Sequence, residues 1–168
     1  SSISTMPLGW VDALASPSGC QAAADQLTDL FHHLARTELD TGKYIHLDLE
    51  PEPGCALDTS DDVTAFFEKY LLGTADERSV RAYLRVCHDV CHAAVMGETQ
   101  AEALNHYRAH GLSVGKVQLS SAIVAPFDAL DAAGRAEAWD QLRQFNEPRY
   151  LHQTTTDAGT ETMRFFDD

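Results

Sequence analysis

Short apolar stretches alternate with amphipathic stretches along almost the whole sequence, and this alternation limits the folds that the chain can adopt. The strand-like stretches are residues 2–6, 44–49, 82–88, 114–119 and 149–153. The helix-like stretches are residues 18–38, 61–72, 99–109 and 130–145. Strands that alternate with helices through short connections form βα units, in which the strands lie parallel in one sheet. We therefore predict an α/β fold with a parallel sheet.

The chain has no sequence feature that divides it into separate domains. It contains no linker, no low-complexity tract and no block of like charges, and its 168 residues suffice for one core. We predict one domain over residues 1–168. The glycine-rich fingerprints of dinucleotide-binding and P-loop proteins, GxGxxG and GxxxxGK[ST], are both missing from the sequence.

Composition excludes several classes of partner. The net charge is −14 and the isoelectric point is about 4.7, so nucleic acids and anionic bilayers would be repelled. No apolar run approaches the ~20 residues of a membrane span, and the first ten residues lack the pattern of a signal peptide. The four cysteines are too few for a disulfide scaffold, so we expect reduced thiols and a cytoplasmic protein.

Polar side chains stand at the end of each of the last four strand-like stretches. In parallel α/β proteins, functional groups gather at the carboxyl ends of the strands, and in a barrel these ends converge on one axis. Carboxylate and amide oxygens together with imidazole nitrogens suit Mn²⁺, Mg²⁺, Co²⁺ or Zn²⁺. We therefore predict one divalent metal site with the ligands Glu50, Asp89, Gln118 and His152.

Several acidic residues and histidines near the strand ends also have a structural interpretation. Glu50 precedes a proline and could be a solvated turn residue, and Asp89 could cap a helix. His92 and His152 could be ordinary structural histidines. The remaining histidines are expected to be solvated or structural; they are His32, His33, His46, His106 and His110.

Two other metal sites are conceivable in the stretch "LRVCHDVCHAAV", residues 84–95. His88 and His92 have the spacing of the zinc-protease motif HExxH, but Asp89 replaces the glutamate and the motif requires a helix. Cys87 and Cys91 could bind structural zinc, although no second ligand pair follows. We expect both cysteines to be small thiols beside the site.

Several short motifs together resemble one protein family. They are "ISTMPLGW" at 3–10, "LEPEPG" at 49–54, "DVCHAAV" at 89–95, "GKVQLSSA" at 115–122 and "YLHQ" at 150–153. In this order they resemble the EboE-type metabolite-traffic proteins, which belong to the xylose-isomerase-like, sugar-phosphate isomerase/epimerase superfamily of TIM barrels.

The resemblance implies roles for individual residues. Metal ligands of the superfamily lie at the ends of the last four barrel strands, and the matching positions here are Glu50, Asp89, Gln118 and His152. His92 matches the histidine of a D-x-x-H segment that lies near the substrate. We therefore take Glu50, as a base, and His92 as the catalytic residues that the resemblance implies.

His152 departs from the family pattern, because sugar epimerases commonly have glutamate at that position. The two-base route of those enzymes therefore lacks one carboxylate. The resemblance leaves open a metal-assisted isomerisation, a lyase reaction, or a non-catalytic metabolite-binding or transport-associated protein with a relic metal site. In each case we expect a small polyol-like or secondary metabolite as the ligand.

The motifs match the strands four to eight of a (β/α)8 barrel. The sequence then resembles the C-terminal part of a longer chain and forms an incomplete TIM barrel. Five strands leave unpaired edges and, we expect, an apolar inner face. We therefore expect the chain to form a homo-oligomer or to pair with the complementary N-terminal part of the same barrel.

Overall fold

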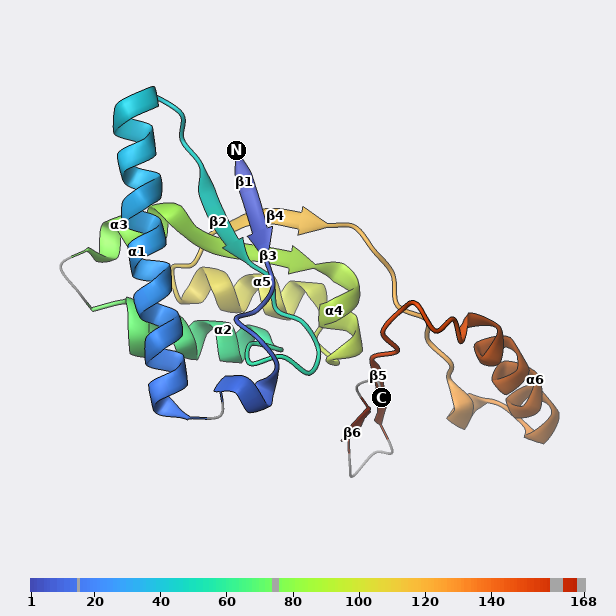
Figure 1. Cartoon of the computed structure of the whole chain (residues 1–168). Helices are drawn as coiled ribbons and strands as arrows, with labels where there is room; N and C mark the ends of the chain where they lie inside the picture. Colours follow the sequence, from blue (N-terminus) through green and yellow to red (C-terminus); the bar gives the residue numbers. More distant parts are fainter. Residues whose placement is uncertain (15, 74–75, 158–161, 166–168) are drawn as a thin grey trace. The chain divides into compact units, whose positions relative to one another are not determined.

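The computed structural model describes residues 1–14, 16–73, 76–157 and 162–165 (Figure 1). It divides into two compact units, Ser1–Ser121 and Ala122–Asp168. The first unit holds the parallel sheet and its helices, and the second holds a short helix and a hairpin. The single domain expected over residues 1–168 stays a prediction.

A four-stranded parallel sheet forms the centre of the first unit, with the order β1-β2-β3-β4. The strands are β1 (Ser2–Thr5), β2 (His46–Leu49), β3 (Leu84–Asp89) and β4 (Val114–Gln118). Strands that follow one another around the sheet are the arrangement of a TIM barrel, whereas doubly wound sheets reverse the order. The fold is therefore α/β, with the curled parallel sheet of an incomplete TIM barrel, as the sequence predicts.

Helices connect the strands of this sheet. They are η1 (Val11–Leu14), α1 (Pro17–Thr41), α2 (Ser60–Phe66), the π-helical turn η2 (Phe67–Leu71), α3 (Glu77–Tyr83), α4 (Val90–Val95) and α5 (Gln100–Ala109). Local capping explains where they begin and end. The Ser16 hydroxyl accepts from Gly19 N at the start of α1, and Gly42, with φ of 70°, ends that helix. Thr59 and Thr99 begin α2 and α5 with capping boxes.

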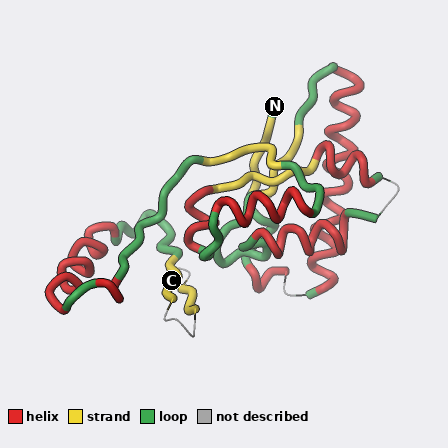
Figure 2. The backbone as a smooth tube through the Cα atoms, turned by 180° about the vertical axis from the view of Figure 1, so that it is seen from behind, coloured by secondary structure: helices red, strands yellow, loops and turns green. Residues whose placement is uncertain are grey.

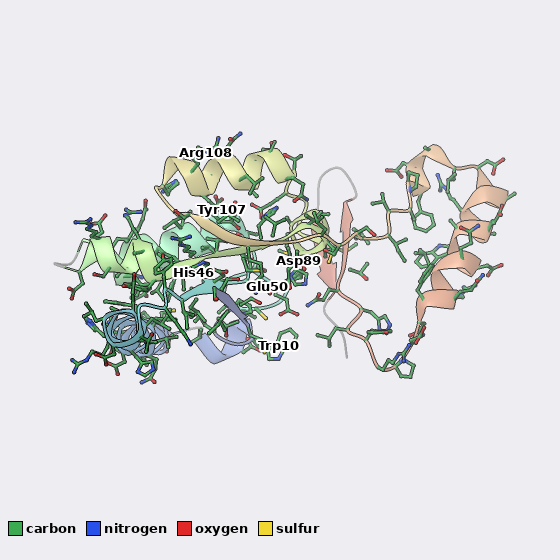
Figure 3. All side chains as sticks on the ribbon, turned by 90° about the horizontal axis from the view of Figure 1, so that it is seen from above. Trp10, His46, Glu50, Asp89, Tyr107 and Arg108 are labelled. Carbon is green, nitrogen blue, oxygen red and sulfur yellow. The ribbon has the colours of Figure 1, made fainter. Side chains whose placement is uncertain are left out.

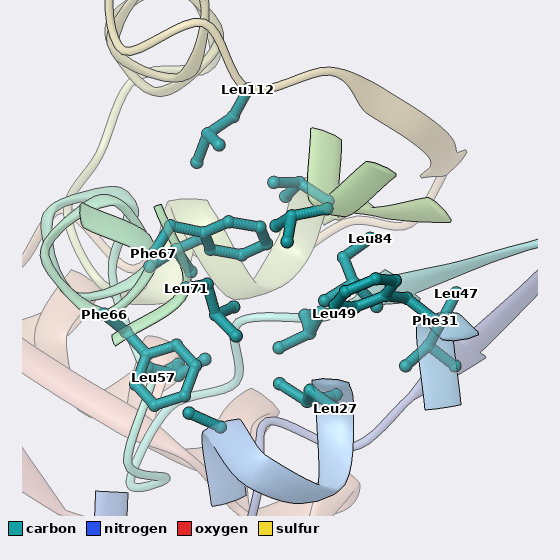
Figure 4. Close-up of a cluster of buried hydrophobic side chains, with 14 of the residues drawn as sticks. Leu27, Phe31, Leu47, Leu49, Leu57, Phe66, Phe67, Leu71, Leu84 and Leu112 are labelled. Carbon is teal, nitrogen blue, oxygen red and sulfur yellow. The ribbon is translucent and has the colours of Figure 1, made fainter. Parts of the chain in front are cut away.

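The hydrophobic core lies between one face of the sheet and the helices (Figures 1 and 2). Alternate residues of β2 and β3 point to this side and meet apolar side chains of α1, η2 and α5. Figure 4 shows Phe31 of α1 beside Leu47 and Leu49 of β2, with Phe67 farther along the same cluster. This packing fixes the sheet and thereby the positions of its strand ends.

The opposite face of the sheet is polar. Asp48 of β2 is fully buried there, and its Oδ1 accepts a hydrogen bond from His46 Nδ1 at 2.6 Å. The Lys116 ammonium of β4 donates to the Ser4 hydroxyl of β1 at 3.0 Å, so the sheet curls enough for its two edge strands to share a contact. The expectation of an apolar inner face is therefore wrong, because charged and hydroxyl side chains occupy it.

A β-bulge lies in the pairing of β3 with β4. Val86 pairs with Val114, but Cys87 pairs with Lys116, so Gly115 is an extra residue on β4. The shift places Lys116 and Gln118 opposite Cys87 and Asp89, as the pairing after the bulge shows. A Cβ atom at residue 115 would lie 2.1 Å from Asp48 Oδ1, which explains why glycine occupies this position.

The second unit differs from the sequence prediction at its end. It contains η3 (Phe127–Ala129), α6 (Ala132–Leu142), η4 (Arg143–Phe145) and an antiparallel pair of strands, β5 (Thr154–Asp157) and β6 (Thr162–Phe165). The predicted fifth parallel strand at residues 149–153 is wrong, because these residues form no strand. The run of threonines that follows, residues 154–156, is the β-branched segment that pairs instead.

Two short helices escaped the sequence analysis. The helix α3 ends directly at β3, and α4 follows β3 without a connecting residue, so no turn signal separates either helix from the strand. All four cysteines are free thiols, as predicted. Among the described helices, none combines the length and the hydropathy that crossing a bilayer requires.

Candidate functional site

Glu50 stands directly after β2, at the carboxyl end of the sheet. Its backbone N donates to the carbonyl of Thr5 on β1, which fixes the residue at the strand end. The side chain is 17% exposed, and its Oε1 accepts a hydrogen bond from Gln118 Nε2 at 2.5 Å. Figure 3 shows Glu50 and Asp89 close together, with His46 farther back along β2.

Asp89 is both the last residue of β3 and the N-cap of α4. Its Oδ1 accepts from the backbone N of Cys91 (2.9 Å) and of His92 (3.3 Å), and from the Ser120 hydroxyl (2.6 Å). Its Oδ2 accepts from Gln118 Nε2 at 3.0 Å. The two interpretations of this residue are therefore compatible, because one oxygen caps the helix while the other faces Glu50.

Gln118 joins the two carboxylates. Its amide nitrogen lies within hydrogen-bond distance of Glu50 Oε1 and Asp89 Oδ2 and so occupies the space between two negative groups. A cation is stabilised in the same kind of position, and two carboxylates would balance the charge of a divalent ion. The donor set thus fits a divalent metal, with the amide turned so that its oxygen faces the ion.

The surroundings shift the pKa values of the Glu50 and Asp89 carboxyl groups in opposite directions. Burial raises the pKa of Glu50 above its ordinary 4.5, and the charge of nearby Asp89 adds to this rise against the effect of His92. Burial would also raise the pKa of Asp89, but hydrogen bonds from Ser120 and Cys91 outweigh it and lower that pKa. Carboxyl groups with separated pKa values are typical of sites in which one exchanges a proton and the other stays ionised.

His92 extends from the first turn of α4 toward Glu50. Its Nδ1 lies 3.0 Å from the carbonyl oxygen of Pro51 and 3.5 Å from Glu50 Oε1. A carbonyl oxygen only accepts, so Nδ1 carries a proton in this arrangement. His92 therefore lies close enough to orient the Glu50 carboxylate.

The two thiols have different neighbours. Cys87 contacts the Glu50 carboxylate, and burial together with Glu50 raises the pKa of its thiol to about 12. Cys91 contacts the Asp89 carboxylate and the Ser120 hydroxyl. Within the described part of the chain, one group of histidine, cysteine and acidic residues has ligand atoms within 4.8 Å of one another, namely Asp89, Cys91 and His92.

The HExxH interpretation does not hold. His88 belongs to β3, is buried on the helix side, and its Nε2 lies 2.6 Å from Gln100 Oε1, whereas His92 faces Pro51. The structural zinc site with both cysteines also fails, because Cys87 is not in the one compact ligand group found among the described residues. His152 belongs to the second unit, so its part in the site stays a prediction.

Some residues of the polar face were missed by sequence analysis. Asp48 was predicted only as a strand residue, yet its Oδ2 is buried without a hydrogen-bond partner. Lys116 and Ser120 enter the sequence analysis only as members of the motif at 115–122. The two-residue spacing of His46, Asp48 and Glu50 was a signal that all three share one face of the sheet.

Similarity to known proteins is found among solved structures. No protein-family model matches the sequence, and no curated protein matches it. One similar solved structure is the apo form of 3-keto-D-glucoside 4-epimerase, YcjR, from E. coli, with 14% identity and a TM-score of 0.44. The similarity covers 84% of this chain and 63% of the epimerase chain. The EboE-type resemblance stays a prediction.

Proposed function

We propose that the chain is a divalent-metal-dependent, sugar isomerase- or epimerase-like protein that acts on a small polyol-like metabolite. The observation that carries this proposal is the meeting of Glu50, Asp89 and Gln118, from three neighbouring strand ends, around one point. His152 is the proposed fourth ligand. Mn²⁺, Mg²⁺, Co²⁺ and Zn²⁺ are all compatible with this set of oxygen and nitrogen ligands.

The proposed mechanism assigns different tasks to the two carboxylates. Asp89, with its lowered pKa, stays ionised and holds the position of the site, since its other oxygen is fixed by α4. Glu50, with its raised pKa, accepts a proton from one substrate carbon and returns it to the neighbouring carbon, so no proton is gained or lost overall. A bound divalent ion would polarise the neighbouring carbonyl or hydroxyl oxygen.

His92 is proposed to contact the substrate and to orient Glu50. Its ring is held by the Pro51 carbonyl, so it cannot turn freely when a ligand enters. The proximity of Nδ1 to Glu50 Oε1 places a proton donor beside the proposed base. The replacement His92→Ala should therefore impair substrate handling more than metal content.

The finer role rests on the sequence resemblance to EboE-type proteins. That resemblance supports a part in handling or trafficking a secondary metabolite. The position of His152, in place of the glutamate common in sugar epimerases, favours an isomerisation with Glu50 as the sole carboxylate base.

A second candidate function is metabolite binding without turnover. One observation favours it: the Gln118 amide nitrogen satisfies both carboxylates and takes the position that a cation would take. An amide donor can thereby replace the metal between the two carboxylates. In that case the protein would bind its ligand without a metal requirement.

The test is metal analysis of the purified chain followed by calorimetric titration with Mn²⁺ and a screen of sugars and polyols. We expect one bound ion per chain and a Mn²⁺ affinity at least about tenfold weaker in Glu50→Gln and Asp89→Asn. Glu137→Gln, which removes the same charge from an exposed position of α6, is the matched control. Ligand binding that is unaffected by chelators would support the second candidate instead.

A further inference from the structure

We propose that Asp89, Cys91 and His92 form a binding position for a soft divalent cation, foremost Zn²⁺, beside the position between Glu50 and Gln118. The ligand atoms of the three residues lie within 4.8 Å of one another. Bonds of ~2.0–2.3 Å to one ion would draw these atoms closer together. The inference rests on the proposed function and shares two residues with it, Asp89 as a metal ligand and His92 as the residue beside Glu50, but it requires no turnover.

The backbone of α4 brings the three ligands together. Asp89 is the N-cap, and Cys91 and His92 follow within the first turn. Their backbone N–H groups both donate to Asp89 Oδ1, which holds the carboxylate against the turn that carries the thiol and the imidazole. The side chain of Cys91 also contacts the Asp89 carboxylate directly. The cluster is therefore set by local structure and independent of the second unit.

The tautomer of the His92 imidazole leaves one ring nitrogen able to bind a metal. Nδ1 lies 3.0 Å from the Pro51 carbonyl, which can only accept a hydrogen bond, so the ring keeps its lone pair on Nε2. Metal-binding histidines usually donate their other N–H to a carbonyl or carboxylate in this way. The His92 side chain is 18% exposed, which leaves a route for an ion to enter.

The thiol decides which ion binds. Cysteine sulfur favours Zn²⁺ over Mg²⁺ and Mn²⁺, which prefer carboxylate and amide oxygens. Because Asp89 belongs to both positions, the two classes of ion compete for it. Binding at the thiolate releases the thiol proton to the solvent, and no oxidation or reduction takes place.

The experiment uses Co²⁺ as a spectroscopic probe for Zn²⁺ in the full chain. We expect Co²⁺ to produce a sulfur-to-metal charge-transfer band in the near ultraviolet, and Zn²⁺ to abolish it. In Cys91→Ser the band should disappear, and the Zn²⁺ affinity should fall at least about tenfold while the Mn²⁺ affinity stays within about twofold. Cys87→Ser, which alters the other thiol of the site, should keep the band.

A band that persists in Cys91→Ser, or Co²⁺ binding without any band, would overturn the inference. So would failure of the folded chain to bind either Co²⁺ or Zn²⁺. If Cys91→Ser does not fold by circular dichroism, Cys91→Ala serves for the same comparison. If the parent chain binds no Mn²⁺ but still shows the thiol band with Co²⁺, the proposed function fails and this inference stands. The failure of one proposal can thus be told from the failure of the other.

Discussion

The two oxygens of the Asp89 carboxylate have different partners and therefore different roles. Oδ1 accepts three hydrogen bonds from α4 and Ser120, which makes it part of the structure. Oδ2 accepts from Gln118 and faces Glu50, which makes it available to a ligand. A substitution at this position can thus separate the capping role from the charge.

Asp89→Asn should keep the helix cap and remove the charge. Asparagine caps about as well as aspartate, so we expect the free energy of unfolding to change by less than about 1 kcal/mol. Divalent metal affinity should fall at least about tenfold, measured by calorimetry. Asp89→Ala loses the cap as well and should cost about 1 kcal/mol in addition. Equal stability of the two variants in urea denaturation would show that the cap contributes nothing.

The pH dependence of stability should reveal the burial of Glu50. Its pKa in the folded chain is raised above 4.5, so ionised Glu50 opposes folding at neutral pH. This cost disappears as the pH falls through the raised pKa. We therefore expect metal-free Glu50→Gln to be more stable than the parent chain at about pH 7, and the difference to vanish below the ordinary carboxyl pKa. Urea denaturation at several pH values checks this, and a less stable variant at neutral pH would contradict it.

At the scale of elements, the bulge at Gly115 decides which side chains of β4 reach the polar face. Strand residues alternate between faces, so a shift of one residue in the register exchanges the two sets. With the bulge, Lys116 pairs with Cys87 and Gln118 pairs with Asp89. The proposed site therefore depends on one irregular residue in the middle of a strand.

Gly115→Ala should destabilise the chain by about 1–3 kcal/mol, because the new methyl group would lie 2.1 Å from the Asp48 side chain. Asp48 is fully buried and hydrogen-bonded to His46, so it cannot move away easily. The double variant Gly115→Ala/Asp48→Ala lacks the side chain that the new methyl group would meet, so it should recover part of the lost stability. The effects of the two substitutions on the free energy of unfolding should therefore not add. Gly134→Ala in α6 is the control and should change stability by less than about 1 kcal/mol. Strictly additive losses would disprove the contact.

At the scale of the whole molecule, charge is distributed unevenly. The chain has a net charge of −14, yet its polar inner face, which carries Asp48, Glu50 and Asp89, also carries the ammonium of Lys116. This ammonium forms no ion pair with a carboxylate within the described residues and donates to Ser4. It therefore opposes the entry of a cation.

Lys116→Met should strengthen divalent metal binding by about two- to fivefold at low salt, since a positive charge near the site is lost and the stem is kept. Lys43→Met makes the same change in net charge at an exposed residue before β2 and should leave the affinity unchanged. Calorimetry with Mn²⁺ at two salt concentrations measures both. Equal effects of the two substitutions would mean that only the overall charge matters.

The sequence by itself determined the α/β class, the four parallel strands and most helix ends. Hydrophobic periodicity and capping residues act over a few neighbours, so they are visible without the fold. The meeting of Glu50, Asp89 and Gln118 was predictable for another reason, because strand ends in a parallel sheet lie on one edge. The fifth strand was misplaced since "RYLHQ" has apolar character but no partner strand among the described residues.

Only the tertiary structure decided how these elements meet. The register of β4 depends on contact between Gly115 and Asp48, residues that are far apart in the sequence. The hydrogen bond from Lys116 to Ser4 joins the two edge strands, so it depends on the curl of the sheet, as does the polar character of the inner face. Such features arise from packing between distant segments, and local sequence patterns carry no information about their distances. The physical reason is that periodicity fixes which face a side chain occupies only after the strand register is fixed.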